Sequence, residues 1–270
     1  MTKLGDFLLG SFPFSRILLT NDDGIDAPGM VALEKVARPL AEDIWIVAPT
    51  HDQSGTSHSI SLHDPLRVTR LDERRFAVSG TPGDCVAIGV QYLMIGTPPD
   101  LILSGINRGA NLGTETVFSG TVGAAMTGML LRIPSIALSQ AFTDRTAVKW
   151  ETSCALAPDV IRCFADLNWS TEACLNVNFP DCTSDQAGPL ILTRQGRGLL
   201  EGIDVISHDD PRDLDYHWLK LLRTTRSDLV ETETSALAAG HISVTPLCFE
   251  RTHDAIRESL KKQMAQRCQS

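Results

Sequence analysis

Two adjacent carboxylates, Asp22 and Asp23, directly follow a short apolar stretch in the segment ILLTNDDGIDAPGM, which covers residues 17–30. Two negative charges beside a buried strand repel each other and are costly to remove from water. A divalent cation would offset both costs, and carboxylate, amide and hydroxyl oxygens are ligands that suit Mg²⁺ or Mn²⁺. The alternative is that the pair serves only as turn residues or as a helix N-cap, with Gly24 ending the strand.

Polar side chains also follow two other apolar stretches in the first half of the chain. The segment IVAPTHDQSGTSHS contains Ser54, and the segment SGINRGANLG contains Asn107 and Asn111. In open α/β sheets, ligands bind in the crevice at the carboxyl ends of the strands. We therefore expect these loops to converge on one crevice, in which Ser54 and Asn107 lie beside the two carboxylates.

The segment FSGTVG begins a predicted helix, with Ser119 as its N-cap and with Gly120 and Thr121 directly after it. The backbone N–H groups and the dipole of a helix N-terminus favour an anion, and a glycine there permits close approach. A phosphate group fits these residues. A plain N-cap is the alternative, because capping accounts for most serines at such positions.

Several other chemistries lack their sequence signatures. The chain contains no G-x-S-x-G elbow, no G-x-G-x-x-G fingerprint after a predicted strand, and no D-x-D arrangement at the adjacent aspartates. The later histidines lack metal-ligand spacing. His51 and His58 lie in the same loop as Ser54. Contact with a substrate stays open for both, but we expect exposure to solvent, because it is the more common state of such residues.

The composition narrows the classes of partner. The 270 residues carry a formal net charge of −9, so we expect no polymeric nucleic acid as a partner, whereas a small anion can bind beside a metal ion or a helix N-terminus. The apolar stretches are too short to span a bilayer, so we expect no membrane partner. The seven cysteines form an odd set without a CxxC pair, which favours free thiols in a reducing cytoplasm.

Strands and helices alternate along the first half of the chain. The predicted strands are residues 17–20, 44–48, 100–105, 135–139 and 174–179. The predicted helices are residues 29–42, which Pro39 ends or kinks, and residues 84–95, 119–131 and 147–167. Such alternation predicts an α/β fold with a Rossmann-like, mostly parallel sheet and helices on both faces.

The second part of the chain has a different pattern. Short ribbon-like strands, a clear strand at residues 241–247 and a polar closing helix at residues 255–266 are predicted there. No linker rich in glycine and serine separates independent domains. We therefore expect one domain over residues 1–270, with an α/β core at 14–190 and a β-rich region at 191–270 that packs on the core or is exchanged with a partner chain.

These motifs together resemble the SurE family of survival proteins, which are metal-dependent 5′/3′-nucleotidases. The resemblance rests on segments that follow one another in family order from residue 17 to residue 247: ILLTNDDGIDAPGM, IVAPTHDQSGTSHS, SGTPGDCV, SGINRGANLG, FSGTVGAAM, LNVNFPD, DPRDLDYHWL and GHISVTPL. It implies a Rossmann-type sheet with a C-terminal β-hairpin and helix that are exchanged in a homodimer or homotetramer.

The resemblance also implies a role for each candidate residue. One divalent metal ion, Mg²⁺ or Mn²⁺, would be held by Asp22, Asp23, Ser54 and Asn107. The catalytic residues would be Asp22, Asp23 and Asn107. The phosphate group would be held by Asn111, Ser119, Gly120 and Thr121.

We therefore expect a metal-dependent phosphomonoesterase that hydrolyses nucleoside 5′-monophosphates, with 3′-monophosphates as an open second class. Two alternatives stay open: an oligomer that binds metal only for structure, and a nucleotide-dependent transferase or dehydrogenase on a similar sheet. The chain departs from the family pattern in three places, one of which is the segment RGLLEGIDVISHDDPRD, which fits only loosely, so no substrate contact is carried over from it. Residues 1–16 are interpreted as an extension rather than a signal peptide, and LGTETVFSG replaces a more acidic stretch in which Glu115 could stand in.

Overall fold

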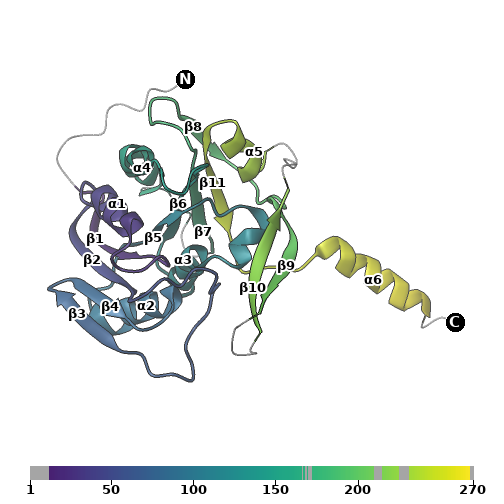
Figure 1. Ribbon diagram of the computed structural model, residues 1–270, viewed down its shortest axis with the longest axis horizontal. Coiled ribbons are helices and arrows are strands. Elements are labelled where there is room, and N and C mark those ends of the chain that lie inside the picture. The colour runs from purple at the N-terminus through teal and green to yellow at the C-terminus, as the bar shows by residue number, and fades with distance from the viewer. Residues whose placement is uncertain are drawn as a thin grey trace.

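A single large sheet is the framework of the fold (Figure 1). The computed structural model describes residues 12–165, 167, 169, 172–209, 215–224 and 231–267. Most of the predicted N-terminal extension, residues 210–214 of the DPRDLDYHWL motif and Cys268 lie outside the described residues. Within the described part of the chain, nine strands form this sheet and two more form a separate hairpin.

Strands and helices alternate through most of the chain. The strands are β1 (Phe14–Thr20), β2 (Ala41–Pro49), β3 (Val68–Asp72), β4 (Arg75–Val78), β5 (Leu101–Arg108), β6 (Ser135–Gln140), β7 (Cys174–Phe179), β8 (Gly188–Leu192), β9 (Leu200–His208), β10 (Tyr216–Arg223) and β11 (His241–Leu247). The helices are α1 (Pro28–Ala37), α2 (Pro82–Ile88), η1 (Gly89–Leu93), η2 (Gly113–Val117), α3 (Gly120–Leu130), α4 (Trp150–Ala165), α5 (Glu233–Ala238) and α6 (Asp254–Arg267).

Six neighbouring strands of the large sheet, in the order β4-β2-β1-β5-β6-β7, are parallel. This is the strand order of a doubly wound Rossmann-type sheet, and it reverses direction between β1 and β5. β3 pairs antiparallel at one edge, and β11 pairs antiparallel with β7 near the other edge, with β8 beside it. The predicted mostly parallel α/β sheet is therefore confirmed.

Helices cover both faces of the sheet, as predicted (Figure 1). α1 packs with α4, and α2 packs with α3. Successive side chains of β1 point to opposite faces, so Ile17 and Leu19 join a core with Leu33 of α1, whereas Leu18 joins a core with Val86 of α2. Burial of each of these side chains contributes roughly 1.5–3 kcal/mol to the stability of the fold. β1 is therefore held from both faces, and the residues that follow its carboxyl end are firmly positioned.

The helix predicted at residues 29–42 is shorter in the structure. α1 ends at Ala37, and Ala41 already pairs with Phe14 at the start of β2. The reason is that Pro39 has no N–H group to donate to the next helical hydrogen bond.

The helix predicted at residues 84–95 begins and ends earlier. α2 starts at Pro82, because Thr81 accepts the N–H of Asp84 and the Asp84 carboxylate accepts the N–H of Thr81 in a capping box. It ends at Ile88, where the chain continues as the π-helical segment η1.

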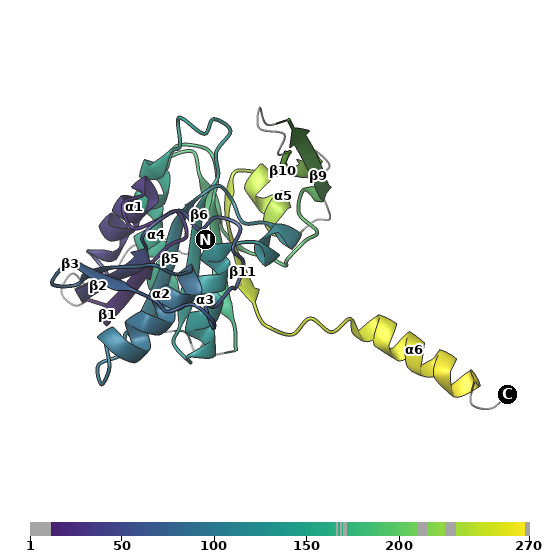
Figure 2. The same ribbon diagram turned by 60° about the horizontal axis from the view of Figure 1, so that its bottom comes forward.

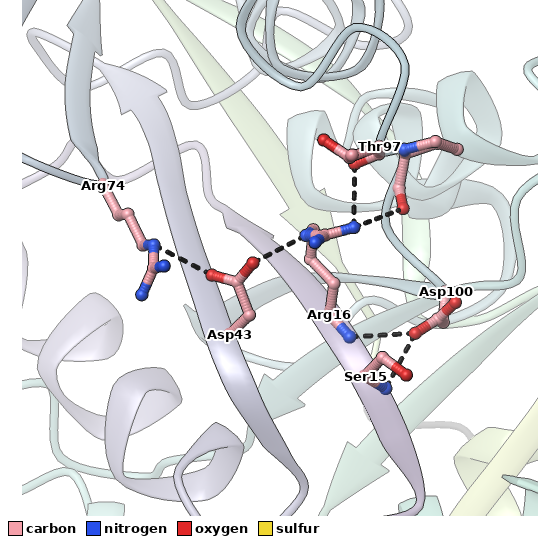
Figure 3. A network of polar contacts seen from close by, with 7 residues as sticks. Ser15, Arg16, Asp43, Arg74, Thr97 and Asp100 are labelled. Carbon is pink, nitrogen blue, oxygen red and sulfur yellow. Dashed lines mark hydrogen bonds and ion pairs between the residues drawn. The ribbon is translucent and has the colours of Figure 1, made fainter.

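Charged side chains at the amino ends of the strands form a network of polar contacts (Figure 3). Nε of Arg16 donates to Asp43 at 2.7 Å, and Nε of Arg74 contacts the other carboxylate oxygen of Asp43 at 2.9 Å. The carboxylate of Asp100 accepts the backbone N–H groups of Ser15 and Arg16, both at 2.8 Å. These contacts hold β1, β2 and the start of β5 together at their amino ends, opposite to the carboxyl ends.

The last part of the chain contributes to the large sheet and also extends beyond it. β11 pairs with β7 and β8, whereas β9 and β10 form the separate antiparallel hairpin. α6 extends away from the body, and none of its residues is buried (Figure 2). A division of the chain at residue 190 stays a prediction, and the large sheet takes strands from both sides of that point. Among the described residues, no helix has the length and apolar character that a membrane span requires.

Candidate active site

The carboxyl ends of β1 and β5 lie side by side where the strand order reverses. Asp22 and Asp23 follow β1, and Asn107 lies at the end of β5. The backbone N–H of Arg108 donates to Asp23 at 3.3 Å, which places its neighbour Asn107 beside the aspartate pair. Nδ2 of Asn107 donates to the carbonyl of Gly109 at 2.8 Å, so the amide oxygen is the atom left to contact a ligand.

Asp22 is buried, with 4% of its surface exposed, and it contacts the N-terminus of α3 directly. The hydroxyl of Thr121 donates to Oδ1 of Asp22 at 2.6 Å. Gly120 lies so close that a Cβ atom there would be 2.8 Å from the Cβ atom of Asp22. The structure therefore joins two features that the sequence presents separately, the carboxylate pair and the predicted phosphate-binding turn.

The loop after β2 approaches Asp22 through its backbone. The N–H of Gln53 donates to the carbonyl of Asp22 at 2.7 Å. Ser54 follows with an exposed side chain, and its N–H donates to Oδ1 of Asp52 at 2.8 Å. Ser54 thus lies one residue from a direct contact with the aspartate segment.

Ionisation of both aspartates is costly in the protein alone. Burial raises the pKa of Asp22 to about 6, the hydrogen bond from Thr121 opposes this shift, and the charge of Asp23 adds to it. Burial also raises the pKa of Asp23, while the N–H and the charge of Arg108 oppose the shift. A cation beside the two carboxylates would reverse both shifts, because a nearby opposite charge favours the ionised form.

The donor set suits a hard divalent cation. Two carboxylates, an amide oxygen and a hydroxyl are oxygen ligands that suit Mg²⁺ and Mn²⁺, and Mg²⁺ also keeps several waters. Thr20 and Ser104 pair across β1 and β5. These two residues and the adjacent Asn21 each have a buried side-chain oxygen that finds no hydrogen-bond partner in the part of the chain that the structure describes. Within the described residues, no group of three or more His, Cys, Asp or Glu side chains could hold a metal ion. A cation here would therefore also need amide, hydroxyl and water oxygens.

Ser119 is the N-cap of α3, as predicted. Its hydroxyl oxygen accepts the backbone N–H of Val122 at 3.1 Å. The first backbone N–H groups of a helix lack acceptors within the helix, and the N–H of Thr121 favours the ionised form of Asp22. Capping and anion binding are therefore compatible in this turn, because the Ser119 side chain takes up only one of these N–H groups, that of Val122.

Asn111 is held by strands β6 and β7. Its N–H donates to Oδ1 of Asn178 at 2.8 Å, and its carbonyl accepts from Asn176 at 2.9 Å and from Asn178 at 3.2 Å. Its side-chain amide donates to Ser139 at 2.9 Å. Among the described residues, its hydrogen bonds run to these strands and none joins it to the turn at Ser119.

The asparagines of β7 received no role from the sequence. Asn176 and Asn178 alternate with apolar residues in LNVNF, a strand whose residues are all buried. Polar side chains in a fully buried strand need hydrogen-bond partners, and this is the signal that marks them. Asp52 and Arg145 also act on the pKa of Asp23, after burial and Arg108, but only the fold brings Arg145 near it.

One of the two histidine predictions is wrong. His51 is exposed, as expected, but His58 is only partly exposed. Nε2 of His58 lies 3.0 Å from the hydroxyl of Thr127, and the ring stacks on Phe249 with centroids 5.7 Å apart. Burial lowers the pKa of His58, and the charge of Arg251 lowers it further. The loop that carries Ser54 is thus packed against the segment leading to α6.

The fold and the crevice define a Rossmann-type α/β protein with an aspartate pair at its strand-order reversal, of which Asp22 is buried and contacts a helix N-terminus. A sequence model of the family described as Survival protein SurE matches residues 17–201. The chain belongs to this family.

Curated relatives and a solved structure cover most of the chain. The chain is 63% identical over 241 residues to the 5′-nucleotidase SurE 1 of Burkholderia lata, covering 89% of this chain and 93% of the relative. It is 48% identical to the 5′-nucleotidase SurE of Paramagnetospirillum magneticum, covering 88% and 91%. The crystal structure of the SurE protein from Aquifex aeolicus matches with a TM-score of 0.79 and 33% identity, covering 92% of this chain and 99% of that one.

Proposed function

We propose that this chain hydrolyses nucleoside monophosphates to nucleoside and inorganic phosphate, with one divalent metal ion. The observation that carries the proposal is the hydrogen bond from Thr121 to Asp22, because it places a helix N-terminus, which favours anions, directly against the buried member of the aspartate pair. Relatives at 63% and 48% identity that are named 5′-nucleotidase SurE support the substrate class.

The metal ion would be held by the oxygens of Asp22, Asp23, Ser54 and Asn107. When bound, Mg²⁺ or Mn²⁺ supplies positive charge that stabilises the developing negative charge of the phosphoryl group. The hydroxyl of Thr121 donates to Oδ1 of Asp22, and Oδ2 would face the cation.

The phosphate group would be held by the turn at the N-terminus of α3 and by Asn111. Uncatalysed phosphate monoester hydrolysis is among the slowest reactions known, with enzymatic accelerations up to ~10²¹. Hydrogen-bond donors that are fixed before the reaction stabilise developing charge without rearrangement. The Ser119–Thr121 turn is fixed by its cap and by Asp22, and one of the two aspartates orients the attacking water.

The proposed substrate position, the proposed absence of a nucleic-acid partner and the proposed location each rest on a separate observation. Nucleoside 5′-monophosphates are proposed as the first substrate class, after the names of the relatives, and 3′-monophosphates as the second. The net charge of −9 disfavours polymeric nucleic acid. The six cysteines in the described residues are free thiols, and this usage supports a cytoplasmic location.

We also propose a homodimer or homotetramer that uses α6. Ile256, Leu260 and Met264 are spaced four residues apart on this helix, and their exposed fractions are 55%, 51% and 65%. An isolated short helix is marginally stable in water, and most helical stability comes from packing of an apolar face. A second copy of the chain is therefore the proposed cover for this stripe. The helix that carries it, α6, stands away from the body in Figure 2.

Phosphate release from chelator-treated protein tests the function. The substrates are 5′-AMP, 5′-GMP, 3′-AMP and a generic aryl phosphate, each without metal, with Mg²⁺ and with Mn²⁺. Asp22→Asn is measured beside the wild type, because it removes a proposed metal ligand and keeps the shape of the side chain. We expect metal-dependent release from nucleoside monophosphates that Asp22→Asn abolishes.

Two results would contradict the proposal. Absence of release under every condition, in a folded protein that binds the metal, would favour a structural metal site. Release that persists without metal, or in Asp22→Asn at the wild-type rate, would remove the aspartate pair from the mechanism.

A further inference from the structure

The segment before the phosphate-binding turn is held by a buried carboxylate from the C-terminal region. Glu233, the first residue of α5, has 0% of its surface exposed. Its Oε1 accepts the N–H of Gly113 at 2.6 Å, and its Oε2 accepts the N–H of Gly196 at 2.8 Å. A buried carboxylate is costly unless it is hydrogen-bonded, so both contacts are needed to keep Glu233 in this position.

Gln195, from the same region, also holds the segment at Gly113. Nε2 of Gln195 donates to the carbonyl of Gly113 at 2.8 Å and to the hydroxyl of Thr116 at 2.9 Å. Gly113 has a φ of +54°, and a Cβ atom there would lie 2.1 Å from the backbone nitrogen of Gly198. The two segments are therefore packed backbone against backbone, and only glycine fits between them.

Glu115, the acidic residue of LGTETVFSG, takes part in the same junction. Its two carboxylate oxygens accept from Nε and Nη2 of Arg223 in β10 at 2.9 and 2.8 Å. This two-point pairing has the geometry of a strong charge-assisted contact. The Glu115 side chain thus ties η2 to the hairpin.

The segment η2, which Glu233, Gln195 and Arg223 hold, continues directly into the phosphate-binding turn. The hydroxyl of Thr116 donates to the carbonyl of Gly113 at 2.7 Å, and the carbonyl of Thr116 accepts the N–H of Ser119 at 3.3 Å. η2 ends at Val117, two residues before the N-cap of α3. A displacement of Gly113 would therefore reach Ser119 through Thr116.

We infer that Glu233 is a positioning residue for the phosphate-binding turn. By holding Gly113 and Gly196 together, it fixes η2 and thereby the N-terminus of α3. Its kinetic consequence rests on the proposed function, whereas its effect on the order of η2 does not. Glu233 acts through Gly113 and has no role in contacting substrate or metal.

The test compares Glu233→Gln with Glu201→Gln in the full-length protein. Glu201 is an exposed glutamate of β9 in the same region, so its variant controls for loss of one charge. Gln has one acceptor oxygen, and its NH₂ group cannot accept from a backbone N–H. Glu233→Gln therefore removes one of the two hydrogen bonds from Gly113 and Gly196. The measurements are kcat and KM for a nucleoside 5′-monophosphate, inhibition by inorganic phosphate, Mn²⁺ affinity, and amide hydrogen exchange.

We expect Glu233→Gln to raise KM and the inhibition constant of inorganic phosphate by roughly 10-fold or more, because misplaced binding groups lose this much. Mn²⁺ affinity and kcat should change by much less, and exchange should rise in residues 113–121. A general loss of structure would instead lower kcat and Mn²⁺ affinity as well, and would raise exchange throughout the chain. Glu201→Gln should match the wild type in every measurement.

Two results would overturn the inference: unchanged exchange in residues 113–121, or raised exchange there with unchanged KM and phosphate inhibition. If Glu233→Gln does not fold, Gln195→Leu answers the same question, because it removes the contacts to Gly113 and Thr116 from the other side. If the wild type itself releases no phosphate, the proposed function fails, and hydrogen exchange alone then decides whether Glu233 orders the segment.

Discussion

Asp22 is a buried carboxylate whose ionisation costs stability when no cation is bound. Its pKa in the folded protein is about 6, above the ordinary value of 3.8, so its contribution to stability is complete below about pH 4 and is lost as the pH rises through about 6. We therefore expect chelator-treated Asp22→Asn to melt a few degrees above chelator-treated wild type at about pH 8 and at the same temperature at about pH 4. Thermal melts followed by circular dichroism measure both.

A metal titration gives this prediction its control. Mg²⁺ or Mn²⁺ should raise the melting temperature of the wild type and leave that of Asp22→Asn almost unchanged, because a ligand stabilises only the state that binds it. Asp26→Asn is the matched control for the loss of one carboxylate charge, since the Asp26 side chain is 90% exposed. Equal melting of wild type and Asp22→Asn at the higher pH would show that burial of this charge is not costly.

The sequence located part of the candidate site because some of its residues are costly unless they have a ligand. Asp22 and Asp23 stand out as adjacent charges after an apolar strand, and the structure brings Asp22 into contact with Thr121. Glu233 and Asn178 could not be assigned in this way. Their partners are backbone groups 120 and 67 positions away, and neither residue type predicts which backbone group it will contact.

At the scale of elements, α3 must approach the end of β1 closely for the candidate site to form. A Cβ atom at Gly120 would lie 2.8 Å from Cβ of Asp22 and 3.2 Å from Pro82. We expect Gly120→Ala to push the helix N-terminus away, to cost about 1–3 kcal/mol of stability, and to lower kcat/KM by at least roughly 10-fold. Phosphate release and denaturant unfolding measure the two effects.

Gly202→Ala is the matched control for this substitution. Gly202 lies in β9, and a Cβ atom there would meet nothing within 4 Å. It should therefore keep wild-type activity and stability. Wild-type kcat/KM in Gly120→Ala would mean that the close approach of α3 is not required.

The elements themselves were largely predictable from the sequence, and their boundaries were less so. The apolar strands β1, β5 and β7 are buried on both faces, so their composition marks them without tertiary information. The end of α2 was not predictable, because the apolar pattern continues through η1 while the hydrogen bonding changes to π-helical. The place of β11 in the large sheet was not predictable either, because it depends on pairing with β7, which is far away in sequence.

At the scale of the whole molecule, the exposed stripe of α6 predicts the oligomeric state. We expect the wild type to have a mass in solution of at least twice the 29.4 kDa of one chain, and the double variant Ile256→Lys, Leu260→Lys to shift toward one chain. Charges in the stripe would have to be buried without partners in an interface, which is strongly unfavourable. Light scattering after size exclusion gives both masses.

A substitution on the other side of the helix separates this effect from a change in helix stability. Ala265→Lys adds one positive charge, where the double variant adds two, and places it about half a turn away from Ile256, given 3.6 residues per turn. It should leave the mass unchanged. A wild type that is monomeric at all concentrations, or a double variant with the wild-type mass, would contradict the proposed role of α6.

The hydrogen bonds that assemble the crevice join residues 85 and 99 positions apart, from Asp23 to Arg108 and from Asp22 to Thr121. Contacts between such distant parts of a chain form slowly, because the loop between them must be closed first. A nascent chain that has emerged only as far as β5 therefore holds the aspartate pair without the helix that faces it. Phosphate-releasing activity is thus acquired late in folding, and its recovery during refolding reports on the docking of α3 against the end of β1.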